Sequence, residues 1–351
     1  MKVESTSTYI RPVARLGHSP AEAALPAIAV GGLATCRFAA AEIIVRDGGQ
    51  VRRRVAAAED LIAGADPGER ALLQRVQQPR AALAGITLDR PRIMGIVNVT
   101  PDSFSDGGRF TTTDAAVAHA LQLEAEGADI LDIGGESTRP RSDPVDVEEE
   151  CRRVLPVIAA IAKQARAPVS IDTRKAEVMR RAALEGARII NDVSALTHDP
   201  AGLSTAAATG LPVVLMHARG DPRTMQDNPT YDDVVLDVYD VLEARIAACE
   251  AAGIARARLI VDPGIGFGKT VAHNLALLGA LSLYHGTGCA VMVGASRKSF
   301  IGRVSGAAAS DRVPGSVAAA LLGVSQGVQL LRVHDVAATR QALAVWEGSL
   351  N

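Results

Sequence analysis

Eight short β-rich runs alternate with longer helical patterns from residue 91 onward, and this alternation constrains the fold more than any other feature. The expected strands are Ile93–Val99, Ile130–Ile133, Val169–Asp172, Ile189–Asp192, Pro212–Met216, Leu259–Asp262, Ala290–Gly294 and Leu330–Val333. The expected helices include Asp114–Glu126, Glu148–Gln164, Ala176–Glu185, Asp232–Ala252 and Gly315–Gly323. Because each gap is long enough for a right-handed crossover helix, we expect the strands to be parallel.

Eight βα units over residues 91–351 match an α/β fold of the (β/α)₈ or TIM-barrel type, whose typical size is ~250 residues. A doubly wound open sheet produces the same alternation and remains the alternative. Residues 1–90 lack this rhythm and hold apolar pieces at Ile28–Leu33 and Ile43–Val45, then a charged helical stretch near Arg52–Arg75. We therefore expect an N-terminal accessory segment, either a small domain or a cap under the barrel, followed by the barrel.

Charge and composition favour a small-molecule ligand. The 37 basic residues are offset by 39 acidic ones spread along the chain, so no basic stripe for nucleic acid is present. Charges and prolines interrupt the most apolar long segment, residues 24–45, which argues against a membrane span. The four scattered cysteines indicate neither a zinc site nor a disulfide framework, and the chain does not begin with an apolar signal, so a cytoplasmic protein with buried thiols is expected.

Polar side chains stand at the carboxyl end of every expected strand. In a barrel these ends meet at one rim, where such enzymes build their active sites. Three positions also have structural interpretations: Asp192 as a helix N-cap, Asp132 as a satisfied loop acid, and His217 as a structural histidine. The complete set is Asn98, Asp132, Asp172, Asn191 with Asp192, His217, Asp262, Ser296 with Arg297 and Lys298, and Arg332 with His334.

Four loops carry more specific chemistry. The loop 262–270 ends in Gly-Lys-Thr, but Pro263 occupies the first glycine position of a phosphate loop, so its glycines are expected to let the backbone approach a flat ligand, with Phe267 as a contact surface. The loop 132–140 combines an acid, hydroxyls and an arginine, which suits an anion and a heterocycle in one pocket. The helix start within 294–299 favours a carboxylate or phosphate, although a solvated basic turn is the alternative.

The fourth loop, NVTPDSFSDGG at residues 98–108, places Phe104 among acids, hydroxyls and glycines. A plain turn uses Pro, Asp and Gly but gains nothing from an exposed aromatic ring. We therefore expect Phe104 to contact a ligand.

Together these segments resemble the dihydropteroate synthase family, and the resemblance covers roughly residues 92–345. The matching motifs, in family order, are IMGIVNVTPDSFSDGG (93–108), DIGGESTRP (132–140), SIDTRK (170–175), IINDVSAL (189–196), LMH (215–217), DPGIGFGK (262–269), GASRKSFIG (294–302) and RVHD (332–335). The resemblance implies a (β/α)₈ barrel, usually a homodimer, that joins 6-hydroxymethyl-7,8-dihydropterin pyrophosphate to 4-aminobenzoate and releases pyrophosphate.

The resemblance also implies residue roles. The pterin would be bound by Asp172, Asn191, Asp262, Lys298, Thr138 and Phe267. The pyrophosphate would be bound by Asn98, Arg332 and His334, with a Mg²⁺ ion held partly by Asn98. The 4-aminobenzoate would be bound by Phe104, Pro140, Arg139 and Ser299. The residues implied in catalysis are Arg332, His334, Lys298 and Asp102.

Two other functions fit part of this pattern. A methyltransferase acting on methyltetrahydrofolate resembles the family in barrel and pterin pocket, but it would not need the TPDSFSDGG loop, Arg332 or His334. A non-catalytic pterin-binding paralogue should have lost phosphate or metal contacts, whereas every motif position is filled here.

Overall fold

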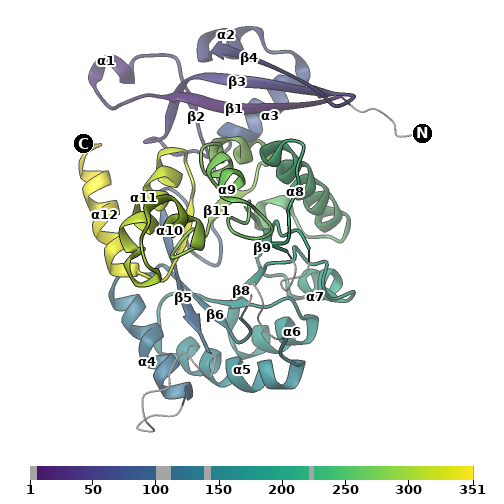
Figure 1. Cartoon of the computed structure of the whole chain (residues 1–351), viewed down its shortest axis with the longest axis vertical. Helices are drawn as coiled ribbons and strands as arrows, with labels where there is room; N and C mark the ends of the chain where they lie inside the picture. Colours follow the sequence, from purple (N-terminus) through teal and green to yellow (C-terminus); the bar gives the residue numbers. More distant parts are fainter. Residues whose placement is uncertain (1–5, 100–111, 138–143, 221–224, 351) are drawn as a thin grey trace.

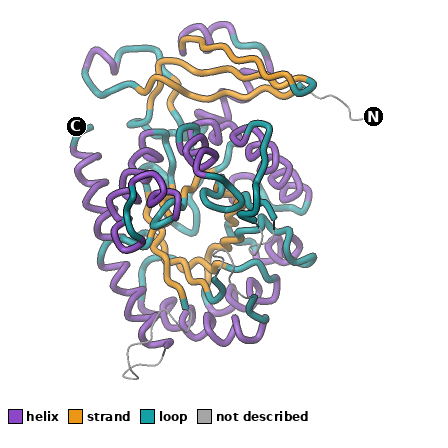
Figure 2. Tube along the Cα trace, in the orientation of Figure 1, coloured by secondary structure: helices purple, strands orange, loops and turns teal. Residues whose placement is uncertain are grey.

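The computed structural model describes residues 6–99, 112–137, 144–220 and 225–350, and its centre is a closed barrel of parallel strands surrounded by helices (Figures 1 and 2). Around the barrel the strand order is β10-β11-β12-β5-β6-β7-β8-β9, with parallel pairing throughout. The barrel strands are β5 Arg92–Asn98, β6 Ile130–Gly134, β7 Val169–Asp172, β8 Ala187–Asp192, β9 Val213–Met216, β10 Leu259–Asp262, β11 Ala290–Val293 and β12 Leu330–Val333.

The helices lie between the strands and cover the outside of the barrel (Figure 2). The predicted elements are therefore confirmed with small shifts at their ends, and the open-sheet alternative is wrong because β9 and β10 close the ring. The helices are α4 Thr112–Ala125, α5 Val147–Gln164, α6 Ala176–Glu185, α7 Gly202–Thr209, α8 Val234–Ala251, α9 Val271–Leu278, α10 Ser299–Ser305, α11 Val313–Ser325 and α12 Val336–Gly348, with 3₁₀ turns η2 Arg256–Arg258, η3 Leu281–Thr287 and η4 Ala309–Asp311.

The barrel interior has an apolar lower layer and a polar upper layer. Side chains alternate along each strand, so every second residue points inward. The lower layer is formed by Met94, Ile130, Ile189, Val214, Ile260, Ala290, Met292 and Leu330. Leu83 and Leu88 pack against this layer, from a turn in which Leu83 and Ile86 form an isolated bridge. The segment before β5 therefore plugs the apolar layer, while the polar layer lies toward the carboxyl ends of the strands.

The N-terminal part of the chain forms a second, antiparallel sheet beside the barrel, drawn in purple and blue in Figure 1. In it, β3 pairs with β1 on one side and with β2 and β4 on the other. The elements are β1 Ser7–Arg15, β2 Ile28–Ala29, β3 Arg37–Asp47, β4 Gln50–Ala57, α1 Pro20–Ala23, α2 Ala58–Gly64 and α3 Pro67–Gln77.

One expectation for this region was wrong in part. The charged stretch near Arg52–Arg75 was expected to be helical, but its first residues lie in β4, and helices begin only at Ala58 and Pro67. The arginines of β4 misled the helical prediction, because β4 pairs along its whole length with the apolar strand β3 and this tertiary pairing overrides their weak local preference.

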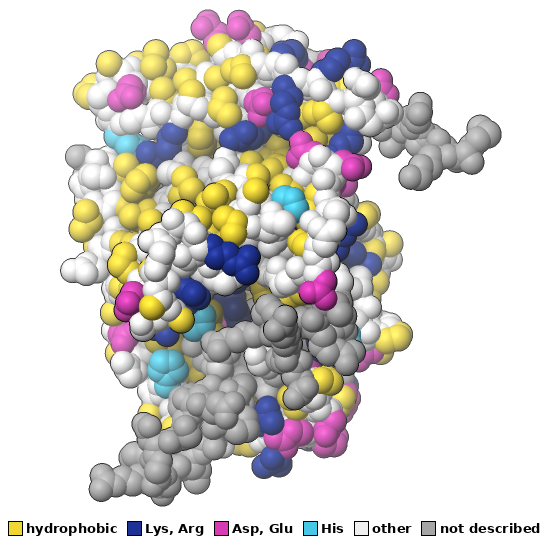
Figure 3. Space-filling model, in the orientation of Figure 1, with side chains coloured by type: hydrophobic (Ala, Val, Ile, Leu, Met, Phe, Trp, Pro, Cys, Tyr) yellow, Lys and Arg dark blue, Asp and Glu magenta, His cyan; other side chains and the backbone are white. Residues whose placement is uncertain are grey.

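The surface shown in Figure 3 mixes both signs of charge over the sheet and the barrel. All four cysteines are buried and free. Among the residues described here, no helix has the length and apolar character that a membrane crossing requires.

Candidate active site

The centre of the polar layer is an arginine that bridges two carboxylates from neighbouring strands. Arg332 on β12 donates through Nε to Oδ2 of Asp132 on β6, at 2.7 Å, and through Nη2 to Oδ2 of Asp172 on β7, also at 2.7 Å. Asp132 is fully buried and Asp172 is 7% exposed. Burial raises the pKa of Asp172 to about 7, with Asp132 adding to this effect and the Arg332 guanidinium opposing it. Burial thus favours the protonated form of Asp172, and the ion pair with Arg332 favours the carboxylate.

Asn191 on β8 completes this side of the site. Its Nδ2 donates to Asp132 Oδ2 at 3.0 Å, so one carboxylate oxygen accepts from both Asn191 and Arg332. From the sequence, Asp132 is either a satisfied loop acid or a site residue. The structure places it inside the barrel, where it orients two residues predicted to be functional. The sequence position could have indicated this, because Asp132 stands two residues after the inward-facing Ile130 on the same strand and must also face inward.

The opposite side of the site is built by β10 and the loop after β11. Asp262 ends β10, and Lys298 Nζ donates to the carbonyl of Ile265 and lies 4.5 Å from the centre of the Phe267 ring. Burial lowers the pKa of Lys298 to about 8, although Asp262 acts against this shift. Burial likewise raises the pKa of Asp262, while Lys298 opposes it. Asp262, Phe267 and Lys298 therefore form one charged and aromatic wall.

Gly294 lies between the two sides of the site. A methyl group built at this glycine would lie 3.7 Å from Asp262 Oδ2 and 3.8 Å from Arg332 Cβ. Asp262 and Arg332 thus flank a common space, and a larger residue at position 294 would occupy part of it.

The glycines of the loop after β10 differ from expectation. They were expected to admit a ligand, but Gly264 (φ +68°) and Gly268 (φ +63°) instead admit protein backbone: a methyl group at Gly264 would lie 1.9 Å from the His217 carbonyl oxygen. Gly266 alone faces the site, since its methyl group would lie 3.0 Å from Lys298 Cδ. The glycine pattern therefore serves mainly to pack two loops together.

A buried lysine joins the same two loops. Lys269 Nζ lies 3.0 Å from His217 Nδ1 and donates to the carbonyls of Phe267, at 3.0 Å, and His217, at 3.3 Å. Burial lowers the pKa of Lys269 well below its usual value, and burial with the lysine charge lowers the pKa of His217 to about 3. The structural interpretation of His217 is therefore correct, and Lys269 turns inward as a tie between the loops.

Asp192 and the segment after β12 also have clear positions. Asp192 accepts hydrogen bonds from the Ser194 and Leu196 amides at 2.6 and 3.0 Å, so it orders the turn after β8. This role is structural, although Asp192 is not a helix N-cap.

His334 Nδ1 lies 3.1 Å from Ser296 Oγ, and the backbone N–H of His334 donates to the same oxygen at 3.2 Å. Arg297, in contrast, turns to Asp335 on the surface.

Two further predicted residues stand at the ends of elements around this centre, and Asn98 is level with Asp172 because both pair with Gly134 of β6. Asn98 ends β5 and is half-buried, and Ser299 is the exposed first residue of α10, with Lys298 in the N-cap position. The predictions for Asp102, Phe104, Thr138, Arg139 and Pro140 lie outside the described residues.

Sequence reasoning assigned no role to a buried charge network beside the site. Lys175 Nζ bridges Glu136 Oε2, at 2.8 Å, and Glu150 Oε2, at 2.5 Å. Glu136 Oε1 also accepts from Arg174, at 3.1 Å, and from the Val145 amide, at 3.1 Å. These contacts tie the loop after β6 to the loop after β7, and both Glu136 and Lys175 lie in the motifs quoted above.

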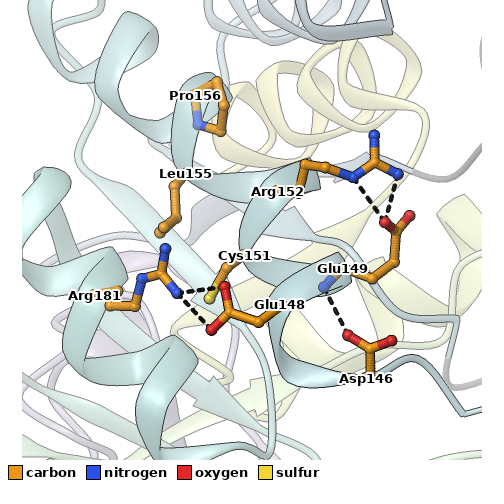
Figure 4. A pocket seen from close by; sticks show the side chains of 8 residues that line it. All are labelled: Asp146, Glu148, Glu149, Cys151, Arg152, Leu155, Pro156 and Arg181. Carbon is orange, nitrogen blue, oxygen red and sulfur yellow. Dashed lines mark hydrogen bonds and ion pairs between the residues drawn. The ribbon is translucent and has the colours of Figure 1, made fainter.

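Neither of the two cavities described lies among the predicted site residues. One, of about 660 Å³, lies on α5 and α6 and is lined by Asp146, Glu148, Glu149, Cys151, Arg152, Leu155, Pro156 and Arg181 (Figure 4). The other, of about 340 Å³, lies between the N-terminal sheet and α8–α9. In the described part of the chain, no group of three or more His, Cys, Asp or Glu side chains is arranged to hold a metal ion.

The barrel and its polar rim agree with the comparisons with known proteins. The model of the family described as "Pterin binding enzyme" matches residues 94–334, which reach from β5 to β12. The chain therefore belongs to the family of pterin binding enzymes.

Within that family it groups with the dihydropteroate synthases. The dihydropteroate synthase of Escherichia coli K12 is 48% identical over 266 residues, which is 76% of this chain and 94% of the relative. The dihydropteroate synthase of Neisseria meningitidis serogroup B is 54% identical over 268 residues, which is 75% of this chain and 94% of the relative.

Solved structures agree with this grouping. Dihydropteroate synthase of Xanthomonas albilineans with 4-aminobenzoic acid is 55% identical with a TM-score of 0.73, covering 77% of this chain and 97% of that chain. The same enzyme in complex with 7,8-dihydropteroate is 53% identical with a TM-score of 0.71, and the match covers 77% of this chain and 98% of that chain. The predicted barrel and the predicted family are confirmed. The N-terminal sheet lies before the family match, which begins at residue 94.

Proposed function

We propose that the chain catalyses the dihydropteroate synthase reaction, joining 6-hydroxymethyl-7,8-dihydropterin pyrophosphate to 4-aminobenzoate and releasing pyrophosphate. The observation that carries this proposal is the meeting of Asp172, Asp262, Lys298 and Arg332 at one end of the barrel. Support comes from relatives over 50% identical whose solved structures hold 4-aminobenzoic acid or 7,8-dihydropteroate.

The pterin is proposed to bind between the two sides of the site. A pterin presents an edge with donors and acceptors side by side, which requires carboxylate acceptors and a group able to do both. Asp172 and Asp262 supply the acceptors, and the Asn191 amide, already oriented by Asp132, supplies the mixed partner. Lys298 donates to the ring carbonyl, and Phe267 contacts the ring face.

The leaving group is proposed to be stabilised by Arg332 and His334. The guanidinium has N–H donors beyond the two that hold Asp132 and Asp172, and His334 directly follows β12. In the reaction the C–O bond to pyrophosphate breaks and pyrophosphate leaves with the electron pair. The amine nitrogen of 4-aminobenzoate then bonds to the methylene carbon, and its released proton passes to pyrophosphate or solvent. Positive groups at the leaving oxygens stabilise this charge as it develops.

A divalent metal fits this arrangement only together with the substrate. Mg²⁺ prefers an octahedron of oxygens, and Asn98 offers a single neutral amide oxygen at the rim. We propose that Asn98 holds Mg²⁺ jointly with phosphate oxygens and water, and when bound the ion would add positive charge at the leaving group. Removal of the metal by EDTA is expected to lower pyrophosphate release and leave pterin binding in place.

The remaining roles are proposed from the resemblance. Ser299 would hold the benzoate carboxylate at the start of α10, while the ring would be contacted by Phe104, Pro140 and Arg139, with Thr138 near the pterin and Asp102 near the pyrophosphate. We also propose a homodimer in the cytoplasm, which sedimentation analysis at micromolar concentration would test.

The reaction is tested by measuring pyrophosphate release with both substrates, with each substrate alone, and with and without Mg²⁺. Release that depends on 4-aminobenzoate supports the proposal. Pterin binding without release under any metal condition would identify a non-catalytic paralogue, and methyl transfer from methyltetrahydrofolate would identify a methyltransferase.

The binding site is tested by Lys298→Ala. This variant is expected to abolish binding of the pterin substrate while the circular dichroism spectrum stays unchanged. Arg303→Ala, at an exposed position on the same helix, is the matched control and should bind normally. Unchanged affinity in Lys298→Ala would remove Lys298 from the site.

A further inference from the structure

The N-terminal sheet contacts a row of acidic residues on α8. Asp233, Asp237, Asp240 and Glu243 recur every three or four residues, so they lie on one face of the helix. Each has a partner in the N-terminal part of the chain. The pairs are Arg53 with Asp233 at 2.7 Å, Arg46 with Asp237 at 2.8 Å and with Asp240 at 3.1 Å, Tyr9 with Asp240 at 2.8 Å, and Arg75 with Glu243 at 3.4 Å.

The sheet presents these partners from one face. Tyr9, Ile44 and Arg53 lie directly opposite one another on β1, β3 and β4, so their side chains point the same way. Tyr9 and Ile44 are 1% exposed and belong to the hydrophobic core of the barrel itself. The Tyr9 ring meets Tyr239 of α8 edge to face, with centroids 5.2 Å apart. The sheet is therefore packed firmly on α8, with arginines beside the apolar contact.

Two of these arginines act on the first turn of α8. Asp233 caps the helix, since its Oδ1 accepts from the Val235 amide at 3.0 Å, while its Oδ2 accepts from Arg53. Asp237 accepts the Asp232 amide through Oδ2 at 3.0 Å and Arg46 through Oδ1. The carboxylates that form the helix start are thus the ones that the sheet holds.

The helix start leads directly to the wall of the candidate site. Tyr231, two residues before Asp233, donates its hydroxyl to the Gly268 carbonyl at 2.9 Å. Gly268 is followed by Lys269, which ties the loop to His217, and preceded by Phe267, which lies against Lys298. A continuous set of contacts therefore runs from the N-terminal sheet to the pterin side of the barrel mouth.

We infer that Arg46 and Arg53 are positioning residues, through which the N-terminal sheet fixes the start of α8 and, by way of Tyr231, the loop after β10. The loop needs such support because Gly264, Gly266 and Gly268 all have positive φ and lose much conformational freedom on ordering. The identification of the bound ligand as a pterin rests on the proposed function, whereas the effect on the loop does not.

The test compares the double variant Arg46→Ala/Arg53→Ala with the single variant Arg52→Ala. Arg52 is the matched control because it lies beside Arg53 on β4, has a side chain 76% exposed, and pairs with Asp47 of the same hairpin at 3.8 Å rather than with α8. Hydrogen exchange of the segments 226–236 and 262–270 is measured in the full chain by mass spectrometry. The double variant is expected to exchange about threefold or more faster in both segments, because the amide bonds of the loop open more often. The control should match the unmodified chain.

Steady-state kinetics distinguish a positioning role of the arginines from a role in overall stability. The double variant is expected to raise the KM for the pterin substrate about fivefold while kcat stays within about twofold, since the arginines do not touch the reacting atoms. Arg53→Ala alone, which should fold even if the double variant does not, is expected to show the same changes at smaller size. Arg53→Lys keeps a cation for Asp233, so its KM and loop exchange should lie close to those of the unmodified chain.

Two outcomes would overturn the inference. A lower melting temperature with unchanged loop exchange and unchanged KM would make the sheet a stabilising element only. Unchanged values in all three measurements would remove any role for the arginines. If the chain released no pyrophosphate at all, the exchange measurement would still decide the inference.

Discussion

The Nη2 atom of Arg332 lies 2.7 Å from Oδ2 of Asp172, although the two residues are 160 positions apart in the chain. The same guanidinium reaches Asp132 at 2.7 Å through Nε. A planar group with donors pointing in two directions can hold both carboxylates at once, which a single ammonium group cannot do in the same geometry. One arginine thus sets the relative positions of two strands' functional side chains.

Arg332→Lys is therefore expected to lower kcat/KM for pyrophosphate release by about 100-fold, because charge is kept but the two-directional geometry is lost. Arg340→Lys is the control, since Arg340 pairs with Asp129 near the start of β6, away from the barrel mouth. It should stay within about twofold of the unmodified chain. Steady-state kinetics of both variants measures the difference, and equal activities would argue against the geometric role.

The pH dependence of kcat/KM should be bell-shaped. Asp172 must be ionised to accept from the pterin, so activity is expected to fall as pH drops through about 7, the raised pKa of Asp172. Lys298 must be protonated to donate, so activity is expected to fall as pH rises through about 8, its lowered pKa. Initial rates at low pterin concentration give the profile over a range of roughly pH 5–10, which brackets both groups.

The raised pKa of Asp172 also predicts how the stability of the chain depends on pH. Because its pKa is higher in the folded chain than the usual 3.8, Asp172 favours folding at low pH and loses that contribution as pH rises toward 7. Asp172→Asn should flatten this part of the stability curve, measured by urea unfolding at several pH values. A curve of the same shape in both proteins would show that Asp172 titrates normally.

Gly264→Ala should destabilise the chain by about 3 kcal/mol or more, because it adds a steric clash to the cost of a positive φ. The added methyl group would lie 1.9 Å from the His217 carbonyl oxygen. Gly253→Ala isolates the backbone cost, since Gly253 has φ +89° with no atom within 4 Å of the methyl position. It should cost only about 1–2 kcal/mol. Urea unfolding gives the free energy of unfolding of each variant from its midpoint, provided that the denaturant slope is unchanged. The difference between the two variants measures the energy of the steric clash.

Leu83→Ala should cost about 2–4 kcal/mol, because it opens a cavity beneath the apolar layer of the barrel. Leu83 is 1% exposed and packs with the inward residues of the barrel strands. Leu184→Ala, at a position 76% exposed on α6, should change stability by about 0.5 kcal/mol at most. Thermal unfolding of the two variants checks this, and equal effects would place Leu83 outside the barrel core.

Local pattern was sufficient for most of the barrel and failed for the N-terminal sheet. Strands such as Val169–Asp172 and helices such as Ala176–Glu185 were predicted to the residue, because short apolar runs and helical spacing are local properties of the chain. The arginines of β4 carry no such signal, since that strand is defined by pairing with β3. Asp192 and His217 lie in the same motifs as the residues proposed to bind the ligand, and only their partners, Ser194 and Lys269, showed that they order loops.

The alternation of elements, the family and the set of polar residues at the barrel mouth were predictable from the chain alone, because periodicity and motif spacing are encoded along it. The folded structure was needed to show that Asp132 orients Arg332 and Asn191, that Lys269 ties the loop after β10 to His217, and that Arg53 meets Asp233. These facts depend on which side chains approach within hydrogen-bonding distance. That distance is a property of the closed barrel and the sheet packed on it, and no stretch of sequence contains it.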